Sequence, residues 1–318
     1  MSTPPLRPPL REVIARHGLA ARHALGQHFL LDENLTARIA RLAGDLAGRN
    51  VIEIGPGPGG LTRALLDQDP ASLTAIELDP RAVAAVTELA ATAPDRLHVI
   101  AADALRLDLT ALVPAPRKIV ANLPYNVATP LLIAWLRQVA GFEGLTLMFQ
   151  QEVADRLRAP PDTAAYGRLS VLAQWTCVVT LGLRLPPAAF TPPPRVHSAV
   201  LCFTPHATQP PPALFAAMER LTAAAFGQRR KMLRGALRSL FPPGNDAAVA
   251  ALLAAGGIAP ERRAETLDVA AFDRLARLLA TTAGPAYAGA DIAGLHIAGP
   301  DIVGPDIAGP DIVGKESP

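Results

Sequence analysis

Short apolar runs and amphipathic stretches alternate along residues 33 to 204. Each apolar run is about as long as one strand, and a stretch with helical spacing usually follows it, as in NVIEI and GLTRALLDQ or SLTAIEL and PRAVAAVTELA. The alternation continues through LHVIAAD, RKIVAN and GLTLMFQ, and the last run precedes QEVADRLRA. Regular alternation of this kind favours parallel strands joined by right-handed crossovers. We therefore predict an α/β domain with helices on both faces of a mostly parallel sheet.

The pattern changes twice towards the C-terminus. CVVTLGLRLP and HSAVLCFTP are β-rich runs separated only by the turn-rich FTPPPRV, which predicts an antiparallel hairpin at the sheet edge and seven strands in all. Beyond Pro212 every apolar pattern is helical, so we predict a small all-α C-terminal domain. We place the α/β domain at residues 33–207 and the helical domain at 208–284.

The two ends of the chain differ in composition from the predicted domains. Residues 1–32 are basic and rich in proline, and LREVIARHGL predicts one short helix that ends at Gly18. From Gly289 a five-residue repeat runs through GPDIV and GPDIA units, whose prolines remove backbone donors. The repeats are too few for a solenoid, so we expect residues 285–318 to be a disordered, low-complexity tail without a catalytic part.

The composition excludes several classes of protein. Half of the residues are hydrophobic and 18% are charged, as in ordinary globular proteins. Cys177 and Cys202 show no CxxC or Cys/His spacing, which argues against disulfides and a metal site and favours a cytoplasmic location. The sequence shows neither the apolar core of a signal peptide nor an apolar window of membrane-spanning length. We expect no contact with a membrane.

A glycine-rich segment, VIEIGPGPGG, joins the first predicted strand to a helix. Gly55, Gly57 and Gly60 fit the pattern G-x-G-x-x-G, which in this context indicates that a nucleotide-bearing cofactor approaches the backbone. Glu77 and Asp103 end the next two strands, where carboxylates suit a ribose and the exocyclic amine of an adenine, although each could instead cap a helix. These residues fit a dinucleotide or S-adenosylmethionine equally well.

The fourth predicted strand ends in NLPY, and this motif favours S-adenosylmethionine. A sulfonium already activates its methyl group, so the difficulty of methyl transfer to adenine lies in its poorly nucleophilic amine. Two carbonyl oxygens, from the Asn122 side chain and the Leu123 backbone, can hold the amine hydrogens and stabilise developing positive charge. Pro124 stiffens the loop, and Tyr125 can stack on the base. A common Asn-x-Pro turn is the alternative.

Two further segments suit a nucleic-acid substrate. In AFTPPPRVHSAV the prolines are rigid and hold Phe190, which we expect to cover the other face of the base or, alternatively, to pack a hairpin. FGQRRKMLRGALR holds several cations and no acid, and helical spacing would place three of its arginines on one face. A solvated basic face is the alternative to RNA binding. The candidate RNA-binding residues are Arg229, Arg230, Lys231, Arg234 and Arg238.

Nine segments together resemble one known family. LGQHFLLD, VIEIGPGPGGLT, IELD, DAL, NLPYNVATP, QQEVADRL, YGRLSVLAQ, FTPPPRVHSAV and FGQRRKMLRGAL occur in the order found in bacterial small-subunit (16S) ribosomal RNA adenine dimethyltransferases, from about residue 10 to 282. The resemblance implies the Rossmann-like fold of class I S-adenosylmethionine-dependent methyltransferases. It also implies dimethylation of two adjacent adenosines in a hairpin loop near the 3′ end of 16S rRNA, with a role in small-subunit biogenesis.

The resemblance assigns roles to individual positions. Asn122 to Tyr125 and Phe190 correspond to the target-adenine pocket, and the helical domain helps to dock the ribosomal particle. His28 stands where the family usually has asparagine, and His197, where it often has aspartate, receives no role. The residues that the resemblance places at the cofactor are His28, Leu30, Gly55, Glu77, Asp103 and Asn122.

The partners follow from the same resemblance. We expect a monomer that binds 16S rRNA in the small ribosomal subunit, takes methyl groups from S-adenosylmethionine without a metal, and does not act on DNA. Three alternatives remain. The same fold serves 23S rRNA methyltransferases, and a protein with these motifs could act mainly as a non-catalytic checkpoint of ribosome assembly. The third alternative is a dinucleotide dehydrogenase, in which NLPY and the arginine-rich segment would have no function.

Overall fold

A computed structural model describes residues 7–19 and 28–282 of the chain. The short helix predicted near the N-terminus is confirmed as α1 (Leu10–Arg16), and Gly18 follows it with a φ of 58°. The predicted tail at 285–318 and the first part of the LGQHFLLD segment lie outside the described residues. Among the described helices, none has the length and apolar character needed to cross a membrane.

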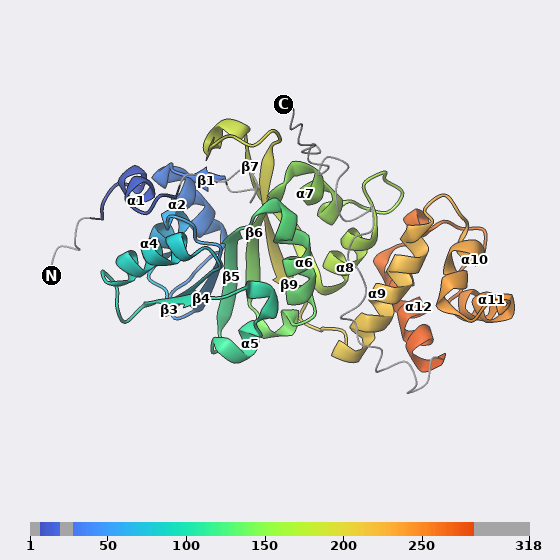
Figure 1. Ribbon diagram of the computed structural model, residues 1–318. Helices are drawn as coiled ribbons and strands as arrows, with labels where there is room; N and C mark the ends of the chain where they lie inside the picture. The colour runs from blue at the N-terminus through green and yellow to red at the C-terminus, as the bar shows by residue number, and fades with distance from the viewer. Residues whose placement is uncertain (1–6, 20–27, 283–318) are drawn as a thin grey trace, which may run out of the picture.

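A seven-stranded sheet forms the centre of the α/β domain (Figure 1), in the order β4-β3-β2-β5-β6-β9-β7. The first five strands of that order pair in parallel, whereas β9 lies antiparallel between β6 and β7. The predicted edge hairpin is therefore confirmed. The strands of this sheet are β2 (Asn50–Ile54), β3 (Ser72–Glu77), β4 (Leu97–Ala101), β5 (Arg117–Asn122), β6 (Gly144–Gln150), β7 (Cys177–Leu185) and β9 (Ser198–Pro205).

Helices cover both faces of the sheet, because alternate residues of each buried strand point to opposite sides. Val51 packs in a cluster with the helices that follow β1, β2 and β3, whereas Ile52 packs in a second cluster with the helices that follow β5 and β6. The first group is α2 (Glu33–Leu42), α3 (Gly60–Leu66) and α4 (Pro80–Ala90). The other helices of the α/β domain are η2 (Ala104–Arg106), α5 (Leu109–Leu112), α6 (Tyr125–Leu136), η3 (Val139–Gly141), α7 (Gln151–Arg158), α8 (Arg168–Thr176) and η4 (Pro187–Ala189).

A separate two-stranded ladder lies beside the carboxyl ends of the central strands. β1 (Phe29–Leu30) pairs in antiparallel fashion with β8 (Phe190–Thr191), although about 160 residues separate them in the sequence. The ladder connects the segment before α2 to the proline-rich segment before β9. Two parts of the chain that the sequence predicts to form one site therefore lie side by side.

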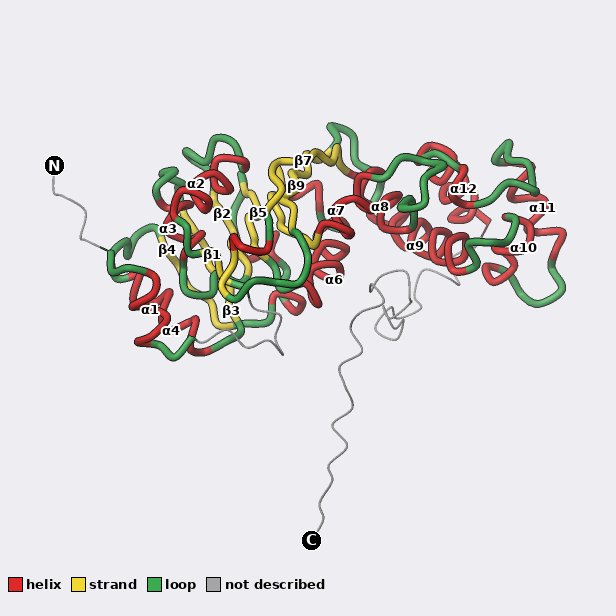
Figure 2. Tube along the Cα trace, turned by 90° about the horizontal axis from the view of Figure 1, so that it is seen from above, coloured by secondary structure: helices red, strands yellow, loops and turns green. Residues whose placement is uncertain are grey.

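The helical domain packs on the far side of α8, as Figures 1 and 2 both show. Arg137, at the end of α6, makes a bidentate ion pair with Glu219 on α9, in which Nη2 donates to Oε1 at 2.8 Å and Nε donates to Oε2 at 3.2 Å. The Trp175 indole of α8 donates to Asp273 of α12 at 2.9 Å. The helices of this domain are α9 (Pro212–Gly227), α10 (Leu233–Ala236), η5 (Leu237–Leu240), α11 (Asp246–Ala255), η6 (Ala264–Thr266) and α12 (Val269–Thr282).

The prediction that helical spacing places Arg230, Arg234 and Arg238 on one face is wrong. α9 ends at Gly227, a turn follows, and the chain resumes as the single turn of α10 and the 3₁₀ turn of η5. The backbone N–H of Leu233 donates to the Arg262 carbonyl at 2.7 Å, so a loop of the helical domain satisfies the new helix start. The arginines of this segment therefore do not share one helical face.

Candidate active site

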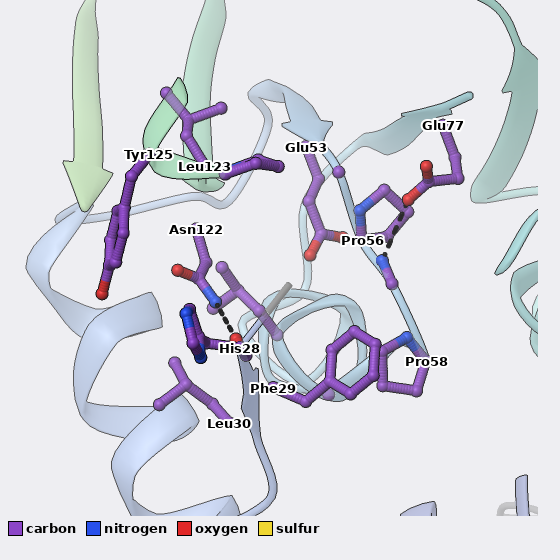
Figure 3. A pocket seen from close by; sticks show the side chains of 15 residues that line it. His28, Phe29, Leu30, Glu53, Pro56, Pro58, Glu77, Asn122, Leu123 and Tyr125 are labelled. Atoms are coloured by element: carbon purple, nitrogen blue, oxygen red, sulfur yellow. Dashed lines mark hydrogen bonds between the residues drawn. The ribbon is translucent and has the colours of Figure 1, made fainter. Parts of the chain in front are cut away.

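A pocket opens at the carboxyl ends of β2, β3 and β5, where the sheet order reverses direction (Figure 3). In open α/β sheets this is the usual place for a ligand. The predicted cofactor residues His28, Leu30, Gly55, Glu77 and Asn122 all line it, together with Leu123, Pro124 and Tyr125. The structure thus brings the glycine-rich turn and the NLPY motif to one cavity.

The glycine-rich turn lines one side of the pocket. Gly57 has a φ of 55°, a conformation that favours glycine, and a Cβ there would lie 3.1 Å from the Phe29 ring. A Cβ on Gly60 would lie only 2.8 Å from the Leu30 carbonyl oxygen, so α3 could not begin so close to β1 with a larger residue. The glycines therefore expose the backbone of the turn to a ligand. They also allow the His28–Leu30 segment to pack against the turn.

Glu77 ends β3 with its carboxylate held by backbone donors. It accepts hydrogen bonds from Gly57 N at 3.2 Å, Leu78 N at 2.8 Å and Asp79 N at 2.9 Å. Oε1 accepts two of these bonds and Oε2 accepts one, so the carboxylate is fixed in orientation and Oε2 keeps acceptor capacity towards the pocket. A ribose hydroxyl can donate to this oxygen.

Glu53 is a pocket residue that the sequence analysis missed. It lies inside β2 and is 1% exposed, and one of its carboxyl oxygens, Oε2, has no hydrogen-bond partner in the described structure. Burial raises the pKa of this carboxyl to about 8; the Thr62 hydroxyl opposes that shift and the charge of Glu77 adds to it. Figure 3 shows the carboxyl pointing into the pocket beside Pro56. An acid within the apolar run VIEI was the signal that could have revealed it.

These features fit S-adenosylmethionine. Its ribose suits the fixed Glu77 carboxylate, and its cationic groups suit an unsatisfied buried acid such as Glu53. No group of three or more His, Cys, Asp or Glu side chains in the described ranges is arranged to hold a metal ion.

The Asn122 side chain is oriented by the segment that crosses the pocket. Its amide nitrogen donates to the His28 carbonyl at 3.3 Å. Figure 3 shows the amide oxygen on the other side, towards Tyr125. Because the nitrogen is engaged, the oxygen remains available to accept a hydrogen bond from a bound group.

Tyr125 and His28 form the aromatic side of the same space. The Tyr125 hydroxyl lies 2.7 Å from the Ser198 hydroxyl, and burial raises the pKa of the Tyr125 phenol. The His28 ring lies 5.7 Å from the Tyr125 ring, centroid to centroid, and its Nδ1 donates to the Pro192 carbonyl at 2.8 Å. With Nδ1 as the donor, Nε2 of a neutral His28 can only accept.

Two predicted site residues do not line this pocket. Phe190 is 3% exposed and lies behind His28, with ring centroids 6.4 Å apart in an edge-to-face arrangement. Asp103 caps η2 by accepting from Leu105 N at 3.0 Å, which is the alternative that the sequence left open. It stands at the end of β4, one strand away from Glu77.

The five candidate RNA-binding cations differ in their surroundings. Arg238 pairs with Asp246 at 2.8 Å, Arg234 approaches Glu261 at 3.9 Å, and Arg229 donates to the Thr163 carbonyl at 3.2 Å. Arg230 and Lys231 are exposed in the turn after α9 and have no ion-pair partner in the described ranges. These two are therefore the freest cations of the segment.

The chain is similar to known proteins over most of its length. Ribosomal RNA small subunit methyltransferase A of Gluconobacter oxydans is 60% identical over 271 residues, which cover 85% of this chain and 87% of the relative. The protein of the same name from Paramagnetospirillum magneticum is 57% identical and covers 86% and 95% of the two chains.

Two solved structures share the fold. A dimethyladenosine transferase from Plasmodium falciparum superposes with a TM-score of 0.67 at 25% identity, covering 78% of this chain and 96% of the other. The 23S rRNA methyltransferase ErmE superposes with a TM-score of 0.58 at 26% identity, covering 79% and 99%. The fold is therefore that of class I methyltransferases, as predicted. Residues 18–281 match the family described as ribosomal RNA adenine dimethylase, and the chain belongs to that family.

Proposed function

We propose that this protein transfers methyl groups from S-adenosylmethionine to the exocyclic amines of two adjacent adenosines in the hairpin loop near the 3′ end of 16S rRNA. Two dimethylated adenosines require four methyl groups. The observation that carries the proposal is the orientation of Asn122, whose amide oxygen faces the space beside Tyr125 in a chain of the adenine dimethylase family.

S-adenosylmethionine, when bound, supplies an electrophilic methyl group on a good leaving group. The task of the protein is to activate the amine. Asn122 Oδ1 and the Leu123 carbonyl accept the two amine hydrogens, which draws the nitrogen lone pair out of conjugation with the ring. The same two dipoles stabilise the positive charge that develops on nitrogen during transfer.

The remaining members of the motif position the base. Pro124 stands directly before α6 and restricts the loop, and the Ser198 hydroxyl fixes the Tyr125 ring on which the base stacks. Stacking of one base on an aromatic ring contributes about 1–3 kcal/mol, comparable to the cost of unstacking it from RNA. We assign Phe190 to the support of His28 and of the base pocket, at the back of the site.

The cofactor residues divide between backbone and side chains. Glu77 holds the ribose, the Gly55–Gly57 turn approaches the cofactor closely, and Glu53 faces its cationic part. His28 and Leu30 cover the cofactor at β1. Asp103 extends the cofactor site along the sheet towards the adenine of S-adenosylmethionine.

The helical domain and the turn after α9 face the ribosomal particle, with Arg230 and Lys231 as the cations free to reach phosphate. Arg229, Arg234 and Arg238 have a smaller part because each already has a partner within the protein. We keep the prediction of a monomeric, cytoplasmic enzyme that needs no metal.

The small subunit is favoured over the large one as the substrate. The 23S rRNA methyltransferase in the comparison is 26% identical to this chain, whereas relatives named for the small subunit are 52–60% identical. A purely non-catalytic assembly factor would not need an amide oriented towards an open pocket.

A parallel assay tests the proposal. Labelled S-adenosylmethionine is offered with undermethylated small subunits, large-subunit RNA and DNA, and the modified nucleotides are mapped by mass spectrometry. We expect label only in the small subunit, as dimethyladenosine at two adjacent positions. Label in large-subunit RNA, or none anywhere, would refute the proposed function.

A further inference from the structure

A second hollow lies beside the catalytic pocket, at the carboxyl end of β6. Its volume is about 640 Å³, within the range of about 300 to 1,000 Å³ that small-molecule sites occupy. Gln150 and the start of α7 form one wall, and Arg195 to His197 form another. It contains His197, a residue to which the family resemblance gave no role.

One residue separates this hollow from the base pocket. Gln150 is paired with Ser198 across β6 and β9, and the Ser198 hydroxyl is the partner of Tyr125. Residues paired in this way have Cα atoms about 5 Å apart. Adjacent nucleotides are joined by one phosphodiester, so the nucleotide next to a base stacked on Tyr125 lies within reach of the hollow.

The Gln150 side chain has the chemistry to read an adenine. It is half-buried, and its amide has no hydrogen-bond partner within the described ranges. A glutamine amide matches adenine in a bidentate way, since its N–H donates to N7 while its oxygen accepts from the N6 amine. The corresponding major-groove edge of a pyrimidine offers only one hydrogen-bonding group, an amine in cytosine or a carbonyl in uracil.

The charges around the hollow leave one cation free. Glu152 pairs with an arginine of its own helix at 2.9 Å, and Asp155 accepts from the Gln151 amide at 2.8 Å and lies 3.9 Å from Arg184. Both acids are thus engaged. Arg195 is exposed and has no ion-pair partner in the described part of the chain, so it is available to a phosphate.

We propose that this hollow holds the adenosine next to the one being methylated, with Gln150 reading its base and Arg195 binding its phosphate. The inference rests on the proposed function, because only a substrate with two adjacent adenosines needs a place for the second. The hollow makes the enzyme specific for a pair of adenosines and keeps the waiting base beside the pocket between transfers.

The test compares two substrates under single-turnover conditions: small subunits with the native adenosine pair, and small subunits whose neighbouring adenosine is replaced by cytidine. The variants are Gln150→Ala, Gln150→Glu and Arg195→Ala. Gln138→Ala, after the end of α6, and Arg11→Ala, an exposed arginine on α1 without an ion-pair partner in the described ranges, are matched controls outside the hollow. Calorimetric affinity for S-adenosylmethionine verifies that each variant is folded.

On the native pair we expect Gln150→Ala to slow methyl transfer about tenfold or more. On the cytidine substrate the wild type is itself slower, and Gln150→Ala causes a much smaller further loss, because only the N4 amine of cytosine remains to pair with the amide oxygen. Gln150→Glu keeps the size of the side chain but loses its N–H donor. We expect its rate of methyl transfer, like that of Gln150→Ala, to depend less on the identity of the neighbouring nucleotide. Arg195→Ala slows both substrates and lowers the salt slope of binding by about one.

An equal loss on both substrates, or no loss in either Gln150 variant, overturns the inference while leaving the proposed function intact. Failure of the wild type to methylate native small subunits would instead refute the proposed function. The two failures are therefore distinguished by the wild-type reaction alone.

Discussion

Replacing Glu53 with glutamine tests the electrostatics of the pocket most directly. The change keeps the size of the side chain and removes its ionisation. Glu53 is 1% exposed, and burial raises the pKa of its carboxyl from 4.5 to about 8. Between pH 4.5 and about 8, the Glu53 carboxyl keeps its proton in the folded protein and has lost it in the unfolded chain.

The direction of the effect follows from this difference in bound protons. Because the native state binds more protons than the unfolded state, the free energy of unfolding falls as the pH rises. The stabilisation from the raised pKa is fully present below pH 4.5 and is lost as the pH rises through about 8. From 4.5 to about 8, at about 1.4 kcal/mol per pH unit, the loss amounts to at most about 5 kcal/mol.

Denaturant unfolding of the wild type and Glu53→Gln at pH 5, 7 and 9 measures the effect. We expect the two proteins to differ by about 1 kcal/mol or less at pH 5, and the variant to be several kcal/mol more stable at pH 9. Glu12→Gln, which changes an exposed acid on α1, is the matched control and should alter stability little at any pH. A difference between wild type and Glu53→Gln that is the same at all three pH values would refute this account of Glu53.

The same pair of proteins tests the assignment of Glu53 to the cofactor. A cationic ligand next to this carboxyl favours its ionised form, so binding of S-adenosylmethionine should release a proton below about pH 8 and strengthen as the pH rises. Glu53→Gln should bind more weakly and lose this dependence. Titration calorimetry in buffers of different ionisation enthalpy measures the proton release, and identical release in both proteins would contradict the assignment.

Three further changes give separate readouts. Asn122→Ala should lower methyl transfer by at least about a hundredfold while small-subunit binding persists, since one oriented acceptor contributes about that much; normal turnover would exclude the amide from the chemistry. Glu219→Ala should lower the free energy of unfolding by about 2 kcal/mol because it leaves Arg137 without its bidentate partner, and a thermal melt would detect this. Charge reversal at Arg230 and Lys231 should lower the salt slope of RNA binding by about one per residue, and an unchanged slope would show that the turn stays in solvent.

The sheet could be predicted because its strands carry their own signal. Apolar runs of strand length ended at Glu77, Asp103 and Asn122, and the structure ends the strands at or within two residues of these positions. α8 (Arg168–Thr176) was not predicted, because its residues from Leu169 to Ala173 are all buried and show no amphipathic period. A helix covered on every side cannot be distinguished by periodicity alone.

The error at the arginine-rich segment has a different cause. Helical spacing was present from Gln228 onwards, but the helix begins only at Leu233, where the Arg262 carbonyl accepts from the Leu233 N–H. Arg262 lies about 30 residues further along the chain. Local spacing could not predict which of the cations the helical domain would neutralise.

In the active site, too, a distant contact decides a detail that the local sequence cannot predict. The NLPY motif predicts that an amide stands at the end of β5, but the direction in which Asn122 points depends on the His28 carbonyl. That carbonyl is placed by the pairing of β1 with β8 and by the hydrogen bond from His28 to Pro192. The amide oxygen can meet an adenine amine only if this distant ladder forms. The proline-rich segment therefore acts on the chemistry by fixing the backbone that orients Asn122, and not only through Phe190.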